Sequence, residues 1–157
     1  MWKAEEREAQ VHRPQPSHNT PTGHEQPGGI ALTVLFTSVP ATLDALRQGA
    51  RLAHQLGARI RVLVPFVVPY PLDLDKPRVS PEFRLRHFRT VCEDQSVETS
   101  IEVRMCRDAQ QCIQQTLLPH SLVLIGGRKV LWPFTREKRL AHGLKRAGHE
   151  VVFVELT

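Results

Sequence analysis

The residues with the clearest capacity for chemistry lie in a basic stretch near the carboxyl end. Positions 128 to 146 hold seven Lys or Arg side chains and a single carboxylate, Glu137. Such cations donate hydrogen bonds to phosphates, and Trp132 and Phe134 beside them could stack on a base. The same pattern is typical of a solvated helix face next to an exposed loop, which is the interpretation we favour. The seven cations are Arg128, Lys129, Arg136, Lys138, Arg139, Lys145 and Arg146.

The other reactive side chains form no catalytic set. Cys106 and Cys112 have a spacing that no redox or zinc motif uses, so we expect buried, inert thiols. Histidines at positions 12, 18 and 24 recur every six residues, a spacing that fits no compact metal site. No Ser or Cys lies in a nucleophile motif that could recruit a His as its base. We therefore expect neither an enzyme nor a metal centre.

Length and composition predict one globular domain behind a tail. The 157 residues are 41% hydrophobic and 24% charged, which is ordinary for a packed protein. Residues 1–29 are rich in Pro, Gly and polar side chains, so we expect a disordered tail followed by a domain spanning 30–157. The tail has three Lys or Arg and four Glu, so the net charge of +5 becomes +6 for the domain. A basic domain of this kind can attract anions.

Three features of the sequence bear on the cellular location of the protein. The apolar stretch Val62–Pro71 contains three prolines and is far shorter than the roughly 20 residues that cross a bilayer. No apolar run follows the charged amino terminus, so we expect no secretory signal and no membrane segment. Three cysteines cannot all pair within one chain, which favours reduced thiols. We therefore expect a cytoplasmic protein.

Strands and helices alternate along the domain. Apolar, β-branched runs predict buried strands at 30–36, 59–68 and 122–125, and a last strand at 151–154. The alternating stretch 97–105 predicts a strand exposed on one face, as at a sheet edge. Capping residues and glycines predict the helices between these strands. The helices are expected from Pro40 to Gly57, from Ser80-Pro81-Glu82 onward, from Asp108 to about Leu118, and from Thr135 to Gly148.

This alternation predicts an α/β fold with an open, parallel, five-stranded sheet and helices on both faces. The edge-like third strand favours the spatial order 3-2-1-4-5. In that order the topological switch lies between strands one and four, and ligands of such sheets bind beyond the carboxyl ends of the strands there. The segments to examine are therefore 37–40 and 126–135.

Several segments resemble the universal stress protein family across residues 30–157. They are Val34–Ser38, Leu52–Ala58, Arg59–Val68 and Leu122–Gly127. The resemblance implies an adenine nucleotide alpha hydrolase-like fold. It also implies a binding or regulatory role, since most members of the family are not enzymes.

The sequence departs from the ATP-binding members of that family. Those members carry an aspartate after the first strand, where this chain has Ser38, and a longer glycine pattern after the fourth. Here the second and third glycines are absent, and Trp132, Pro133 and Phe134 fill space and remove a backbone donor that a phosphate cradle would use. The positions that the resemblance leaves as cofactor-binding candidates are Thr37, Ser38, Gly126, Gly127, Arg128, Lys129 and Thr135.

These features favour a stress-response or regulatory protein without the usual ATP binding and with no bound cofactor. One alternative is a member that binds ATP or AMP through Arg128, Lys129 and Thr135 in place of glycine amides. Another is a nucleic-acid-associated domain centred on the last helix, which we consider unlikely.

The last strand, Val151 to Leu156, is expected to lie at the edge of the sheet. It is apolar and carries neither Pro nor Lys, the residues that usually discourage pairing of an edge strand. A two-fold pairing of two such strands would cover it, so we expect a homodimer. A different protein partner is also possible.

Overall fold

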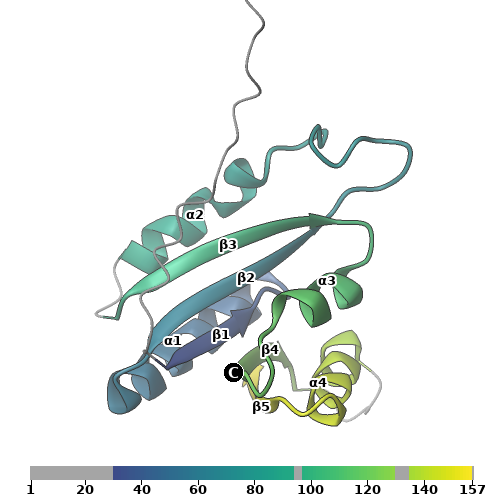
Figure 1. The fold of residues 1–157 in the computed structure, drawn as a ribbon. Helices are drawn as coiled ribbons and strands as arrows, with labels where there is room; N and C mark the ends of the chain where they lie inside the picture. Colours follow the sequence, from purple (N-terminus) through teal and green to yellow (C-terminus); the bar gives the residue numbers. More distant parts are fainter. Residues whose placement is uncertain (1–29, 94–96, 130–134, 157) are drawn as a thin grey trace, which may run out of the picture.

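The structure, a computed structural model, describes residues 30–93, 97–129 and 135–156, and Figure 1 shows their arrangement. The tail expected at 1–29 lies outside the described residues. Within them, five strands alternate with four helices, as the sequence predicts. The strands are β1 (Ala31–Leu35), β2 (Arg59–Val67), β3 (Thr99–Cys106), β4 (Leu122–Arg128) and β5 (Glu150–Leu156). The helices are α1 (Val39–Leu56), α2 (Pro81–Glu93), α3 (Ala109–Thr116) and α4 (Arg136–Arg146).

The five strands form one sheet in the order β3-β2-β1-β4-β5, which confirms the predicted order. All neighbouring pairs are parallel, because each crossover carries a helix from one end of the sheet back to the other. In the centre, Leu32 of β1 aligns with Ile60 of β2 on one side and Leu122 of β4 on the other. The switch point therefore lies between the carboxyl ends of β1 and β4.

The helix ends follow the capping residues in the sequence. Helix α1 starts behind Ser38 with a proline in its first turn, and it stops at Gly57, whose φ of 60° suits glycine. The Asp108 side chain accepts a hydrogen bond from the Gln111 amide at 2.7 Å and so caps α3. Thr135 caps α4 in the same way. Helix α3 ends at Thr116, two residues earlier than the sequence suggested.

Helices cover both faces of the sheet, as predicted. On one face α1 packs on the central strands and α2 packs on the edge strand β3, with Leu46 and Phe88 fully buried. On the other face α3 and α4 bury Ile113 and Leu144 against the sheet. Burial of aliphatic side chains on both faces explains why β1, β2 and β4 are nearly continuous apolar runs.

One difference from the expected layout bears on the candidate site. Strand β4 continues through Gly126 and Gly127 to Arg128, so both glycines lie in the sheet and not in a loop. Strands β3 and β5 form the two edges, and each has exposed or half-exposed side chains along much of its length. None of the helices in the described ranges is long and apolar enough to cross a membrane.

Candidate functional site

Thr37 joins the two strands that flank the switch point. Its hydroxyl donates a hydrogen bond to the carbonyl oxygen of Gly126 at 2.8 Å, linking the end of β1 to β4. Its backbone amide donates to Thr42 Oγ1 at 3.1 Å, and Thr42 Oγ1 donates to the Ser38 carbonyl at 2.7 Å. Because Thr42 is fully buried in the first turn of α1, these bonds hold the turn between β1 and α1 closed.

Ser38 lies where an acidic side chain would be expected in an ATP-binding relative. It is the N-cap residue of α1, with extended backbone angles, yet its hydroxyl makes no capping hydrogen bond. The side chain is exposed at the carboxyl edge of the sheet. A neutral hydroxyl can donate or accept one bond there, but it brings no charge to orient a ligand.

Gly126 permits a very close approach between β4 and α1. A Cβ atom at this position would lie 1.9 Å from the carbonyl oxygen of Ala41 and 2.5 Å from its carbonyl carbon. Both atoms belong to the helix backbone, which cannot rotate away as a side chain could. The first turn of α1 therefore rests directly on the β4 backbone, and only glycine fits between them.

Gly127 faces the opposite side of the sheet and is covered as well. A Cβ atom there would meet the Phe153 ring of β5 at 2.6 Å and Cβ of Glu137 in α4 at 3.2 Å. The two glycines thus serve contacts of the sheet with α1 on one side and with Phe153 and α4 on the other. Their presence near the end of β4 is explained by packing, without a ligand approaching the backbone.

The three remaining candidate residues lie around the carboxyl end of β4. Arg128 and Lys129 are exposed, and Lys129 Nζ lies 3.8 Å from Glu155 Oε2 of β5. The Thr135 hydroxyl accepts a hydrogen bond from the Lys138 amide at 3.3 Å. Of the predicted set, the structure brings Thr37 and Gly126 into direct contact. The residues between 129 and 135, including Trp132, Pro133 and Phe134, lie outside the described ranges.

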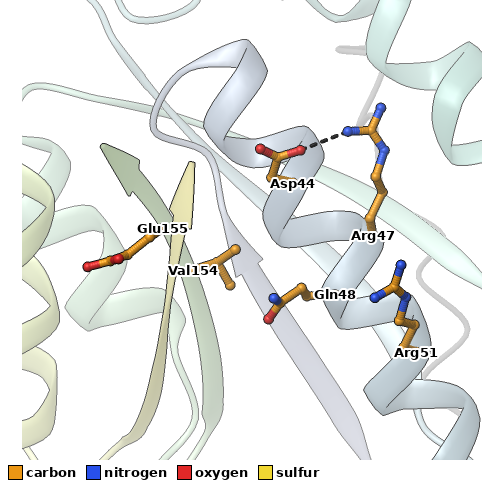
Figure 2. A pocket seen from close by; sticks show the side chains of 6 residues that line it. All are labelled: Asp44, Arg47, Gln48, Arg51, Val154 and Glu155. Atoms are coloured by element: carbon orange, nitrogen blue, oxygen red, sulfur yellow. Dashed lines mark hydrogen bonds and ion pairs between the residues drawn. The ribbon is translucent and has the colours of Figure 1, made fainter. Parts of the chain in front are cut away.

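A hollow between α1 and β5 was not foreseen from the sequence. It has a volume of about 170 Å³, and Figure 2 shows its polar lining. One of its two arginines, Arg47, is held by Asp44 at 2.7 Å, while Arg51 extends from the next turn of the same helix. The recurrence of polar residues every three or four positions was the available signal. Its lining residues are Asp44, Arg47, Gln48, Arg51, Val154 and Glu155.

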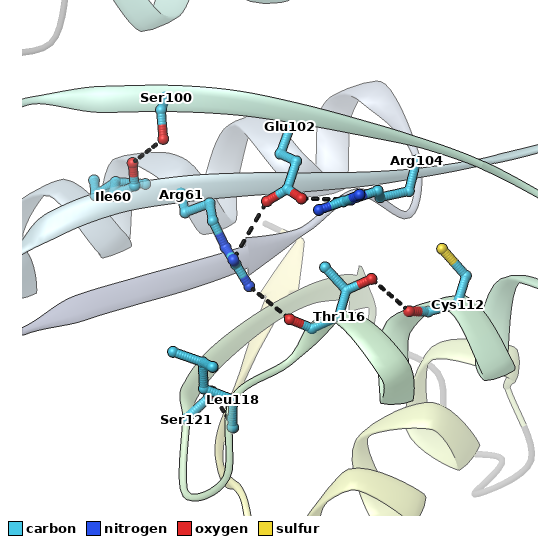
Figure 3. A network of polar contacts seen from close by, with 9 residues as sticks. All are labelled: Ile60, Arg61, Ser100, Glu102, Arg104, Cys112, Thr116, Leu118 and Ser121. Atoms are coloured by element: carbon cyan, nitrogen blue, oxygen red, sulfur yellow. Dashed lines mark hydrogen bonds and ion pairs between the residues drawn. The ribbon is translucent and has the colours of Figure 1, made fainter. Parts of the chain in front are cut away.

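A polar network covers the other face of the sheet near β3 (Figure 3). Arg61 Nη1 lies 3.3 Å from Glu102 Oε2, and Glu102 Oε1 accepts a bond from Arg104 Nε at 2.5 Å. Arg61 also donates to the Thr116 carbonyl at 3.4 Å, while its buried Nε atom has no hydrogen-bond partner among the described residues. Through these contacts the network connects the end of α3 to β2 and β3.

The thiols of Cys106 and Cys112 meet at the junction of β3 and α3. Burial, followed by the nearby Cys112 and then by the carboxylate of Asp108, raises the pKa of Cys106 to about 11. Since the thiolate is the reactive form, this pKa keeps Cys106 unreactive at neutral pH. Within the described ranges, no three His, Cys, Asp or Glu side chains come together as a metal site would require.

Comparison with solved structures shows the same fold in a protein of known family. The structure of a universal stress protein from Archaeoglobus fulgidus superposes with a TM-score of 0.59. The match covers 80% of this chain and 93% of that chain, at 14% sequence identity. No family model matches the sequence, and no curated protein matches it. The likeness therefore confirms the predicted universal stress protein-like α/β fold, at the level of the fold.

Proposed function

We propose that this chain is a universal stress protein-like regulatory protein, without enzymatic activity, that does not bind ATP in the manner usual for that family. The observation that carries this proposal is the packing of Gly126 and Gly127. Where a phosphate cradle needs bare backbone, the space over both glycines is filled by α1, Phe153 and Glu137. A role in the cytoplasm accords with the cysteine count, because three cysteines cannot all pair within one chain.

The side chains at the switch point support the same conclusion. Ser38 supplies no charge, and the Thr37 hydroxyl already donates its proton to the Gly126 carbonyl. A nucleotide would have to displace this bond, leaving a buried carbonyl without its partner. The intrachain contacts therefore compete with the ligand that this point of the fold usually attracts.

A second candidate is an altered nucleotide site that uses charge instead of glycine amides. Arg128 and Lys129 are exposed at the carboxyl end of β4, close to the amino terminus of α4. Together they could neutralise two phosphate charges, with the Thr135 hydroxyl as a third donor. This arrangement would hold a triphosphate at the surface and not within the switch point.

Thermal unfolding with and without 5 mM ATP and Mg²⁺ separates the two candidates. A ligand at 100 times its dissociation constant adds about 2.7 kcal/mol to the free energy of unfolding, which a thermal scan resolves easily. We expect no change in Tm for the parent protein. An increase that disappears in the double variant Arg128→Ala, Lys129→Ala would establish the altered site and refute the leading proposal.

We also propose that the protein is a homodimer paired through β5. The Glu150 amide donates to the Ser121 carbonyl on the β4 side, at 3.1 Å. Because successive residues of a strand point their amides to opposite sides, the amides of Val151, Phe153 and Glu155 face the free edge. The neighbouring Val152 side chain is 38% exposed. An antiparallel partner strand would satisfy the free amides and cover that valine.

A further inference from the structure

The positive charge of the domain is concentrated in one segment. Residues 128–146 hold seven Lys or Arg and one Glu, while the rest of the domain holds eleven basic and eleven acidic residues. The whole excess of +6 therefore lies in a segment formed by the end of β4, the connection that follows it, and α4. A surface region of one charge sign attracts ligands of the opposite charge.

The structure places four of these seven cations on one exposed face of α4. Helix α4 buries Ala141 and Leu144 against the sheet, and its exposed positions are all basic or histidine. Four of these cations, unlike Arg47, Arg61 and Arg104 elsewhere, make no ion pair with any described residue. The exposed residues of α4, called the basic face below, are Arg136, Arg139, His142, Lys145 and Arg146.

Helix stability does not account for the charge at the start of α4. Arg136 is the first residue of the helix, where the macrodipole disfavours a cation. Arg128 and Lys129 add positive charge at the end of the preceding strand. A cation at a position where it costs stability points to a partner that supplies negative charge.

The residue types on the basic face indicate which class of partner it binds. Its five exposed positions offer no aliphatic or aromatic anchor, whereas protein interfaces depend on such anchors and interfacial membrane helices insert them. Arginine, which holds three of the five positions, matches phosphate geometry with its planar fork. The eleven residues of α4 span about 16 Å, the length over which one strand of a duplex presents about five phosphates.

We propose that the basic face of α4 binds the phosphate backbone of double-stranded nucleic acid without reading its sequence. The sequence alone favoured a solvated face. The structure adds that these cations lie together, point outward and lack partners among the described residues. This inference is independent of the proposed function, because the basic face does not include the switch point between β1 and β4.

The test measures binding of the full chain to a labelled 24-base-pair duplex by fluorescence anisotropy between 50 and 200 mM NaCl. If four phosphates are contacted, the logarithm of the association constant should fall with a slope of about −3.6 against the logarithm of salt concentration. The triple variant Arg136→Gln, Arg139→Gln, Arg146→Gln should reduce that slope by about 2.7 and weaken binding at least tenfold at 50 mM.

A control triple removes the same charge elsewhere. Arg51→Gln, Arg78→Gln and Arg86→Gln alter exposed arginines on other elements, and this protein should keep the parental slope. Equal weakening by the two triples would reduce the effect to net charge and overturn the proposal. No binding by the parent at 50 mM salt would overturn it as well.

Two further measurements keep the test decisive. Poly-glutamate and phosphatidylserine vesicles of matched charge serve as competitors. Displacement of the duplex by either one at equal charge would indicate that the basic face binds an acidic protein or a membrane instead, and would overturn the proposal. If the α4 triple melts more than 10 °C below the parent, Lys145→Gln with Arg146→Gln replaces it. Both of those side chains are exposed at the carboxyl end of α4, and their loss should reduce the slope by about 1.8.

Discussion

Replacing Gly126 with alanine tests directly how closely α1 rests on the sheet. The new Cβ would lie 1.9 Å from the Ala41 carbonyl oxygen, so the first turn of α1 must move by more than 1 Å. Overpacking of a core typically costs 1–3 kcal/mol, and contact with backbone places this variant at the upper end. We expect a loss of about 3 kcal/mol in the free energy of unfolding. For a domain of this size, that loss lowers Tm by about 10 °C.

Alanine variants at two other glycines provide values with which the loss in Gly126→Ala can be compared. In Gly127→Ala the Cβ meets the edge of the Phe153 ring, which can shift, so we expect a smaller loss of about 1–2 kcal/mol. In Gly143→Ala, inside α4, the Cβ meets no atom within 4 Å, and the variant should gain about 0.5–1 kcal/mol from helix propensity. Urea unfolding of the three proteins measures each value. A Gly126→Ala protein within about 0.5 kcal/mol of the parent would refute the packing explanation for the glycine.

Three further predictions concern the edge strand, the thiols and the turn after β1. Sedimentation at tens of micromolar should show a dimer, and Val152→Lys should convert it to a monomer. Met105→Lys, on the other edge strand at an equal exposure of 38%, should leave the dimer intact. A monomeric parent protein would exclude the dimer. The raised pKa of Cys106 means that the folded state holds its proton more tightly, so stability should fall as pH rises from about 9 to about 11, and Cys106→Ser should flatten that part of the profile. Thr42→Val should cost about 1–3 kcal/mol in urea unfolding because the Thr37 amide loses its acceptor, whereas Thr42→Ser should cost less; equal losses would assign the effect to packing.

The strand order could be predicted because it depends on patterns that are local in the sequence. Buried strands such as 122–125 are uniformly apolar, and the edge strand around Ile101 alternates, so each strand reveals how many of its faces are covered. Capping residues such as Asp108 and Thr135 mark helix starts to within one position. These signals require no knowledge of which distant segments touch.

The candidate site was harder to predict because its contacts are long-range. Gly126 resembles the first glycine of a phosphate loop, and only the position of Ala41, 85 residues earlier, shows what fills the space above it. The bond between Thr37 and Gly126 likewise spans 89 residues. Residue identity showed that these positions could approach a ligand closely, but it could not show that the chain itself occupies the space.

The bond from the Thr37 hydroxyl to the Gly126 carbonyl also bears on how the stability of the fold depends on nucleotide concentration. A fold whose central strands are bridged by a bound nucleotide gains stability in proportion to the logarithm of nucleotide concentration, and its abundance then follows the energy state of the cell. Here the bridge is part of the chain and is present at every metabolite concentration. Under the proposal that no nucleotide binds at the switch point, the free energy of unfolding does not depend on nucleotide concentration.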